Sequence, residues 1–283
     1  MKGERKKNED AVREANIRYH TALANTYDQT QPNFKEENVA QVRERLKRLA
    51  EETGGKRLLD IGCGTGFMLT LAAPYFDEVY GIDITPAMLD LAKIKMNEDG
   101  LKNVKFVLAP SEKLPFEDAY FDVVTAYGVL HHLPNLARTF KEARRVMKPN
   151  GVFYSDEDPN YYFWSAIKAL PENVTETLAI ERRGVCQMGS EVRKVVGNIL
   201  DDDTIEMAEY HKMKGGFKEK WINKLLMQAG FSTAYFEYKW FWQEGKVMRD
   251  ISPEVAIYFE KHLRSALPIT RNFFKYLRIE ARA

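Results

Sequence analysis

Short apolar runs alternate with segments of helix length through the middle of the chain, and this alternation limits the fold most strongly. The runs cover residues 57–61, 78–83, 104–108, 121–126 and 151–155. Each is rich in the β-branched, aromatic and aliphatic residues of buried strands. Helix-length segments between strands imply crossover connections, so the strands should lie parallel in one sheet with helices on both faces. The pattern predicts an α/β fold of the doubly wound type.

The remaining segments do not alternate in this way, and we divide the chain into five regions. Residues 1–50 are strongly charged, with apolar residues at helical spacing, and they precede a core at 51–158. Residues 159–215 are predicted to form a helical insertion. Residues 216–245 are predicted to end the core sheet with a helix and an aromatic strand. Residues 246–283 are predicted to form C-terminal helices, near 253–266 and 269–281.

Composition excludes several classes of protein. The 283 residues include 42 Lys and Arg against 41 Asp and Glu, a net charge of +1, which argues against binding along a nucleic-acid backbone. The 2 cysteines cannot form a disulfide framework and favour a reducing compartment. No apolar run approaches the roughly 20 residues of a membrane span, and the charged first residues lack the apolar stretch of a signal peptide. We therefore expect a cytoplasmic protein without a transmembrane segment.

The first strand runs directly into a glycine-rich loop. Residues 58–67 read LLDIGCGTGF, with glycines at 62, 64 and 66. Glycine permits a tight turn and a close approach of backbone N–H groups to a ligand. The helix that follows adds a partial positive charge at its N-terminus, which suits a carboxylate or phosphate. The alternative is a tight strand-to-helix turn that binds no ligand.

An acidic residue ends the second strand. Asp83 follows Asp60 by 23 residues, and in doubly wound folds a carboxylate at this place accepts hydrogen bonds from a ribose. The dinucleotide fingerprint requires its third glycine where this chain has Phe67. A nucleotide ligand is therefore predicted, whereas a pyrophosphate-linked dinucleotide, and with it a nicotinamide oxidoreductase, is disfavoured.

These motifs together resemble those of the class I S-adenosylmethionine (AdoMet)-dependent methyltransferases, in particular the small-molecule group that includes quinone-biosynthesis methyltransferases. Four segments match in order: LDIGCGTGF, GIDIT, FDVVTAYGVLHHLPN and VMKPNGVFYSDEDPN. The similarity covers residues 27–160 and resumes weakly at 216–238. It implies a Rossmann-like, mostly parallel seven-stranded sheet, an N-terminal helical lid over 1–50, a helical insertion after strand five, and S-adenosyl-L-methionine as cofactor.

The resemblance also implies which residues bind the cofactor. The glycine loop would hold the methionine part, Asp83 the ribose and Ile84 the adenine, while Tyr27 of the lid folds over them. Asp60 has two compatible readings, since its carboxylate can fix the glycine turn or orient the ammonium group of the cofactor. The predicted cofactor-binding residues are Tyr27, Asp60, Gly62, Cys63, Gly64, Gly66, Asp83, Ile84, Ser111, Glu112 and Tyr127.

The segment after the third strand departs from the family pattern. The family typically has Gly-Asp-Ala-Glu-x-Leu-Pro-Phe, whose aspartate contacts the adenine amino group, whereas residues 109–116 read APSEKLPF. Pro110 stands in the place of the aspartate and has neither a side-chain acceptor nor an N–H to donate. Ser111 is the candidate substitute, through its hydroxyl or its N–H.

Candidate catalytic residues follow the fourth and fifth strands, whose carboxyl ends border the ligand crevice of a doubly wound sheet. His131 and His132 can take up a proton near neutral pH; the alternative is a pair at a helix start, one packed and one solvated. Asp156 begins an acidic cluster that can bind a cation, bind a metal or act as a base, or else supply caps and turns before Pro159. No His, Cys and Asp spacing is typical of a metal site, so none is predicted.

The predicted function is methyl transfer from AdoMet to a small-molecule acceptor by in-line displacement, with the insertion forming the acceptor side of the crevice. An RNA or protein methyltransferase and a non-catalytic AdoMet-binding regulatory protein are the alternatives. The expected helix at 269–281 carries aromatic and basic residues, which leaves three partners open for it: its own domain, a membrane surface or a second copy of the chain.

Overall fold

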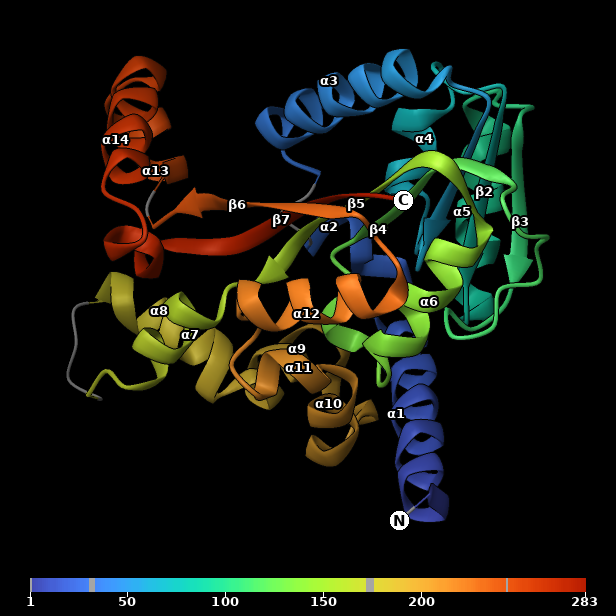
Figure 1. Ribbon diagram of the computed structural model, residues 1–283. Coiled ribbons are helices and arrows are strands. Elements are labelled where there is room, and N and C mark those ends of the chain that lie inside the picture. Colours follow the sequence, from blue (N-terminus) through green and yellow to red (C-terminus); the bar gives the residue numbers. More distant parts are fainter. Residues whose placement is uncertain (1, 31–33, 172–175, 243) are drawn as a thin grey trace.

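A seven-stranded sheet lies between two layers of helices in the computed structural model, which describes residues 2–30, 34–171, 176–242 and 244–283 (Figure 1). The strand order is β3-β2-β1-β4-β5-β7-β6. The pairs β1–β2, β1–β4, β2–β3 and β4–β5 are parallel, whereas β7 is antiparallel to both β5 and β6. The prediction of a doubly wound, mostly parallel sheet of seven strands is confirmed.

The elements follow one another in the order expected for crossover units. The strands are β1 Arg57–Ile61, β2 Glu78–Asp83, β3 Val104–Leu108, β4 Phe121–Tyr127, β5 Met147–Pro159, β6 Thr233–Phe241 and β7 Phe274–Arg282. The helices are α1 Lys2–Leu23, α2 Tyr27–Thr30, α3 Glu36–Thr53, α4 Phe67–Ala72, α5 Pro86–Glu98, α6 Leu136–Val146, α7 Tyr161–Lys168, α8 Glu176–Cys186, α9 Met188–Val196, α10 Asp202–Ala208, α11 Tyr210–Met213, α12 Glu219–Ala229, α13 Glu244–Asp250 and α14 Pro253–Ser265. Short 3₁₀ turns are η1 Ala24–Thr26, η3 Leu130–His132, η4 Gly197–Ile199 and η5 Ile269–Phe273.

Both faces of the sheet are covered because successive strand residues point to opposite sides. Leu58 packs in a cluster with α3, α4 and α5, while the next residue, Leu59, packs in another with α6 and α12. Both leucines are fully buried. In Figure 1, α3 accordingly lies on one side of the sheet and α12 on the other. Continuous apolar strands such as β1 are what a parallel sheet buried on both faces requires.

The predicted helix over 269–281 is wrong, because residues 274–282 form strand β7. This strand lies between β5 and β6, where Leu277 pairs with Asp158 on one side and Tyr238 on the other. Leu277, Ile279 and Ala281 are fully buried and alternate along the strand. The strands that pair with β7 on both sides are distant in sequence. The local spacing of apolar residues therefore indicated a helix, because the alternation of a strand is recognisable here only once its partners in the sheet are known.

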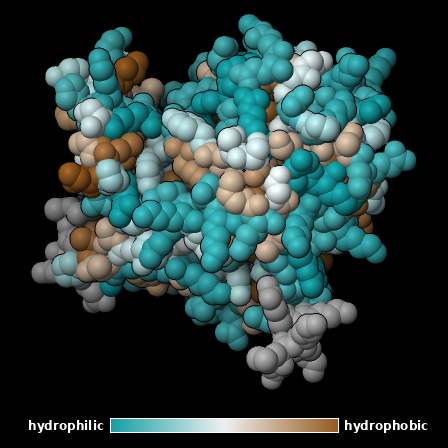
Figure 2. All heavy atoms as spheres, in the orientation of Figure 1, coloured by the Kyte–Doolittle hydropathy of each residue, from teal (hydrophilic) through white to brown (hydrophobic). Residues whose placement is uncertain are grey.

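The strand also changes the division of the chain and the expected outer surface. Residues 246–283 are not C-terminal helices throughout, since the last of them complete the sheet. Nor is 1–50 only a lid, because α3 packs directly on the sheet through Val42 and Leu46. Phe274 and Leu277, expected on a membrane- or partner-facing helix, are buried. Exposed apolar side chains gather instead over α14, at the upper left of Figure 2.

The insertion after β5 is helical, as predicted, with α7 to α11 in its described part. The N-terminal helix packs against it, since Tyr19 and Leu23 of α1 contact Leu200 and Ile205. Figure 1 shows α1 and α10 side by side below the sheet. Across the described residues, we find no helix with the length and apolar character needed to cross a bilayer.

Candidate functional site

The glycine loop joins β1 to α4 in a conformation that side chains would disturb. Gly62 has φ +68°, and a Cβ placed on it would lie 2.3 Å from a methyl carbon of Val129. Gly66 caps α4 with φ +93°. A Cβ on Gly64 would meet open space, so the backbone at this residue faces a cleft. The loop is therefore shaped for close approach of a ligand to the main chain.

Asp83 ties the loop to the end of β2. Its Oδ2 accepts a hydrogen bond from the N–H of Gly64 at 3.0 Å, and its Oδ1 accepts one from the N–H of Thr85 at 2.8 Å. The side chain is only partly buried and lines the cleft beside Ile84. A carboxylate held in this way is preoriented to accept hydrogen bonds from vicinal hydroxyl groups.

The cleft opens at the carboxyl ends of β1, β2 and β4, as expected for a doubly wound sheet. Eight of the eleven predicted cofactor-binding residues line it: Tyr27, Gly62, Gly64, Asp83, Ile84, Ser111, Glu112 and Tyr127. The other three, Asp60, Cys63 and Gly66, are not among its lining residues.

Cys63 and Gly66 belong to the loop itself, and Asp60 precedes it on β1. Asp60 is 2% exposed and accepts a 2.6 Å hydrogen bond from the hydroxyl of Thr125. Burial raises the pKa of its carboxyl group to about 8. Burial likewise raises the pKa of the Cys63 thiol, which makes this cysteine unsuited to act as a nucleophile. Gly66 lies against α5, where a Cβ would be 3.0 Å from the terminal methyl of Met96.

Ser111, the predicted substitute for the aspartate of the family pattern, lies at the cleft. Its hydroxyl is 2.9 Å from the hydroxyl of Thr139 and 3.3 Å from a carboxylate oxygen of Glu112. The side chain is buried. The hydroxyl therefore already has protein partners, and its backbone N–H remains the simpler group to offer to an adenine.

Helix α1 also contributes to the cleft, which the sequence did not predict. Arg13, Asn16 and His20 line it, and they are spaced three and four residues apart, which places them on one helix face. Arg13 forms an ion pair with Glu112 at 3.5 Å. The side-chain amide of Asn16 donates a hydrogen bond to the carbonyl of His132 at 3.1 Å. This spacing of polar residues was visible in the sequence, but it did not show what the face covers.

A second cavity of about 250 Å³ adjoins the first. Five residues line both: His20, Tyr27, Tyr127, Gly128 and His132. The second cavity is further walled by His131, Glu157 and Trp164, and by Glu209 from the insertion. Its lining is aromatic on several sides, with a few titratable groups, which is typical of a site for a small organic molecule.

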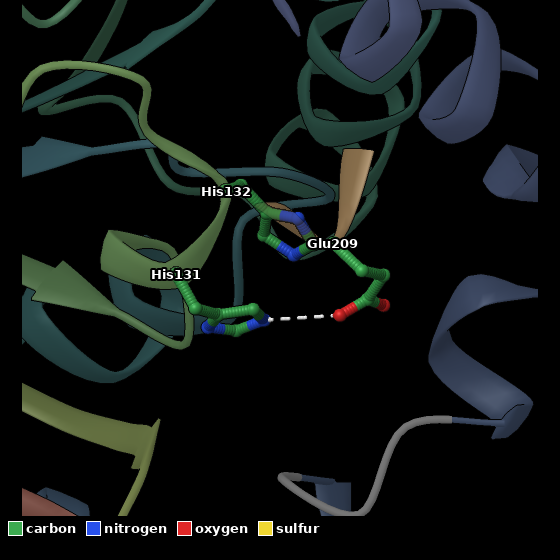
Figure 3. A group of neighbouring side chains, drawn as sticks. All are labelled: His131, His132 and Glu209. Atoms are coloured by element: carbon green, nitrogen blue, oxygen red, sulfur yellow. Dashed lines mark ion pairs between the residues drawn. The ribbon is translucent and has the colours of Figure 1, made fainter. Parts of the chain in front are cut away.

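The two predicted catalytic histidines lie side by side in this cavity, with their ring centroids 4.0 Å apart (Figure 3). Both are about 8% exposed, so neither is the solvated member of a helix-start pair. Nδ1 of His131 lies 2.9 Å from a carboxyl oxygen of Asp158, and Nδ1 of His132 lies 2.7 Å from the carbonyl of Ala208. Burial lowers the pKa of His131 to about 4 and that of His132 as well.

Comparison with known proteins identifies the middle of the chain. Residues 59–155, which hold the glycine loop, Asp83 and the two histidines, match a family model described as a methyltransferase domain. This segment of the chain is therefore similar to methyltransferase domains.

Relatives of this segment are numerous, and they match only part of the chain. An uncharacterized methyltransferase, YcgJ of Bacillus subtilis, is 36% identical over 117 residues, 40% of this chain and 46% of its own. The demethylmenaquinone methyltransferase of Lactococcus lactis is 34% identical over 151 residues, 52% of this chain and 58% of its own. The chain thus spans about half the length of these curated relatives.

Solved structures share the fold of most of this chain. The crystal structure of YcgJ from Bacillus subtilis has a TM-score of 0.54 and 20% identity, covering 86% of this chain and 98% of that one. An S-adenosylmethionine-dependent methyltransferase from Mesorhizobium loti also has a TM-score of 0.54, at 17% identity, covering 85% and 96%. At these identities the likeness concerns the fold alone.

Asp156, which directly follows the matched residues, lies outside the linings of both cavities. Its carboxylate accepts hydrogen bonds from Nε of Arg278 at 2.6 Å, from the hydroxyl of Tyr154 at 2.9 Å and from the N–H of Glu157. It is 2% exposed. Asp156 therefore joins β5 to β7, whereas its neighbour Glu157 reaches the second cavity.

Proposed function

We propose that this chain transfers the methyl group of AdoMet to a small-molecule acceptor. The proposal depends on one observation, that two cavities adjoin each other. One lies beside the glycine loop and Asp83, whose position suits a carboxylate that binds a ribose. The other is walled by aromatic and titratable side chains. The match of residues 59–155 to the methyltransferase family supports AdoMet as the ligand of the first.

The two cavities suit an in-line displacement. The methyl group of a sulfonium is transferred when the acceptor atom, the methyl carbon and the sulfur are aligned, so the protein mainly positions both molecules and excludes water. In our proposal the backbone at Gly62 and Gly64 holds the amino-acid part of AdoMet, and Asp83 holds its ribose. Tyr27 and Tyr127, which line both cavities, would then flank the methyl group.

The enclosure of the second cavity favours a small acceptor over a polymer. Its walls come from α1, from β4 and the turn after it, from β5 and β7, and from the helical insertion. The near-neutral net charge of the chain also argues against binding along a nucleic-acid backbone. Among the relatives, the demethylmenaquinone methyltransferase and the ubiquinone biosynthesis O-methyltransferases of Acinetobacter are named for quinone pathways. Trp164 and Tyr276 in the lining suit a planar ring by stacking.

Calorimetric titration with AdoMet tests the cofactor assignment. We expect Asp83→Asn to bind AdoMet about 10–100-fold more weakly than the wild type, because a hydrogen bond to a charged group contributes about 1.5–3 kcal/mol. Asp90→Asn is the matched control: this exposed carboxylate on α5 pairs with Lys93, outside the cleft. Equal affinities of the wild type and Asp83→Asn would contradict the ribose assignment.

Methyl transfer itself is tested by incubating the protein with labelled AdoMet and a metabolite extract. The absence of methylated products would contradict this part of the proposal.

A further inference from the structure

Three side chains of metal-ligating type converge in the second cavity. His131, His132 and Glu209 each present one ligand atom, and these atoms all lie within 4.8 Å of one another. All three residues are buried. Figure 3 shows the two rings and the carboxylate around a common space, with Nε2 of His131 3.7 Å from Oε2 of Glu209.

Hydrogen bonds behind the rings turn the correct nitrogens toward this space. A carbonyl oxygen can only accept a hydrogen bond, so Nδ1 of His132 carries the proton that it donates to Ala208, and its Nε2 is left with a free lone pair. Nδ1 of His131 pairs with the carboxyl group of Asp158, which leaves Nε2 of that ring toward Glu209. Carboxylate and carbonyl partners of this kind orient histidine ligands in metalloproteins.

Glu209 lies at the junction of α10 and α11. Its Oε1 accepts a hydrogen bond from the hydroxyl of Tyr19 at 3.1 Å. Its Oε2 accepts no well-aligned hydrogen bond from the described residues, although the ammonium group of Lys212 lies 3.2 Å away. The side chain of Lys212 is 26% exposed, so it can move toward solvent when a cation approaches the carboxylate.

The spacing of the three ligand atoms matches the size of a transition-metal ion. Zn²⁺ binds histidine nitrogen at about 2.0–2.1 Å and carboxylate oxygen at about 2.0–2.2 Å, so two ligand atoms on one ion lie at most about 4 Å apart. The 3.7 Å between His131 and Glu209 already satisfies this limit, and movements of about 1 Å bring the whole set within it.

We propose that His131, His132 and Glu209 bind one divalent transition-metal ion of the Zn²⁺ and Fe²⁺ class. Imidazole nitrogens with one carboxylate suit these ions, whereas Mg²⁺ and Ca²⁺ prefer oxygen ligands throughout. Three protein ligands leave at least one coordination position open, and here that position faces the second cavity. The proposed site stands independently of methyl transfer, since it depends only on the side chains that form it.

Metal titration of the chelator-treated 283-residue chain, without AdoMet, tests the site directly. We expect one equivalent of Zn²⁺ to bind in calorimetry, and Co²⁺ as a spectroscopic substitute to produce visible ligand-field absorption that Zn²⁺ abolishes. Wild-type protein that takes up neither ion would overturn the proposal, whatever its activity toward AdoMet.

Variants locate the ion. His131→Ala and Glu209→Gln should each remove the visible Co²⁺ bands and weaken Zn²⁺ binding more than Asp158→Asn, which changes only the partner behind the ring and should weaken it about 10–100-fold. His262→Ala is the matched control, because His262 lies on α14 in an exposed position and bonds to the carbonyl of Tyr258. Thermal unfolding checks that each variant is folded. Unchanged Zn²⁺ affinity in folded His131→Ala and Glu209→Gln would show that the ion binds elsewhere and would refute the site.

Discussion

At the residue scale, Asp60 is a buried acid near the end of β1, just before the glycine loop. Its carboxyl group is 2% exposed, and its hydrogen-bond donor is the neutral hydroxyl of Thr125. Burial, together with the nearby charge of Asp83, outweighs this hydrogen bond and raises its pKa to about 8. We therefore expect the folded chain, when no ligand is bound, to hold a proton on Asp60 at neutral pH.

This proton makes stability depend on pH in a predictable direction. An unfolded aspartate ionises near pH 4, so between about pH 4 and 8 the folded state binds a proton that the unfolded state does not. The contribution of Asp60 to the free energy of unfolding should therefore fall as the pH rises, by at most about 1.4 kcal/mol per pH unit. Urea unfolding of Asp60→Asn, which keeps an acceptor for Thr125, should lack this part of the decline and should show the variant gaining on the wild type toward pH 9. Parallel curves for the two proteins would refute the raised pKa.

Some residues of the two cavities could be predicted from the sequence, and others could not. Gly62, Gly64 and Asp83 were predicted because each lies in a local motif with a backbone or carboxylate role that its neighbours reveal. His131 and His132 were found in the same way. Glu209 was not, because it belongs to an insertion without a readable motif, and only packing of α10 and α11 against the turn after β4 brings it to the histidines.

At the scale of elements, strands whose partners come early in the chain were predicted well, and the last strand was not. β1, β2 and β4 carry apolar runs that are buried because helices cover both of their faces. β7 instead mixes apolar residues with charges, including the buried Arg278. A buried arginine is stable in a strand only when acidic partners neutralise its charge. The partners of Arg278 are Asp156 on β5 and Glu237 on β6, which lie far away in sequence.

These partners make Arg278 a test of how β7 is held. We expect Arg278→Met to lower the free energy of unfolding by about 3–5 kcal/mol, because it leaves the carboxylate of Asp156 buried without its counter-ion. Arg282→Met is the control on the same strand: its ion pair with Glu52 is 40% and 34% exposed and should contribute less than about 1 kcal/mol. Denaturant unfolding measures both. Equal losses in the two variants would show that the Arg278 pair has no special role in the sheet.

At the scale of the whole molecule, the N-terminal segment lines the cleft and also packs on the helical insertion. Helix α1 packs on the insertion through Tyr19 and Leu23, and Arg13 and Tyr27 line the cleft. Asp28 attaches this N-terminal segment to the domain, since it accepts a hydrogen bond from the hydroxyl of Thr65 in the glycine loop and forms a 3.0 Å ion pair with Lys95 on α5. The segment that lines one side of the cleft is therefore bonded to the glycine loop on the other side.

This arrangement predicts that Asp28 controls exchange of AdoMet more than it controls folding. Asp28→Asn keeps an acceptor for Thr65 and removes the charge that faces Lys95. Because a partly exposed ion pair contributes about 0.2–1 kcal/mol, we expect AdoMet to dissociate up to about 5-fold faster, with little change in the free energy of unfolding. Stopped-flow displacement of bound AdoMet by an excess of its demethylated product measures the rate, and hydrogen exchange should show faster exchange over residues 13–28 in the ligand-free variant. Asp90→Asn, which removes an equally simple ion pair with Lys93 on the same helix, should change neither. If Asp28→Asn behaved like this control, the N-terminal segment would have no part in admitting or retaining the cofactor.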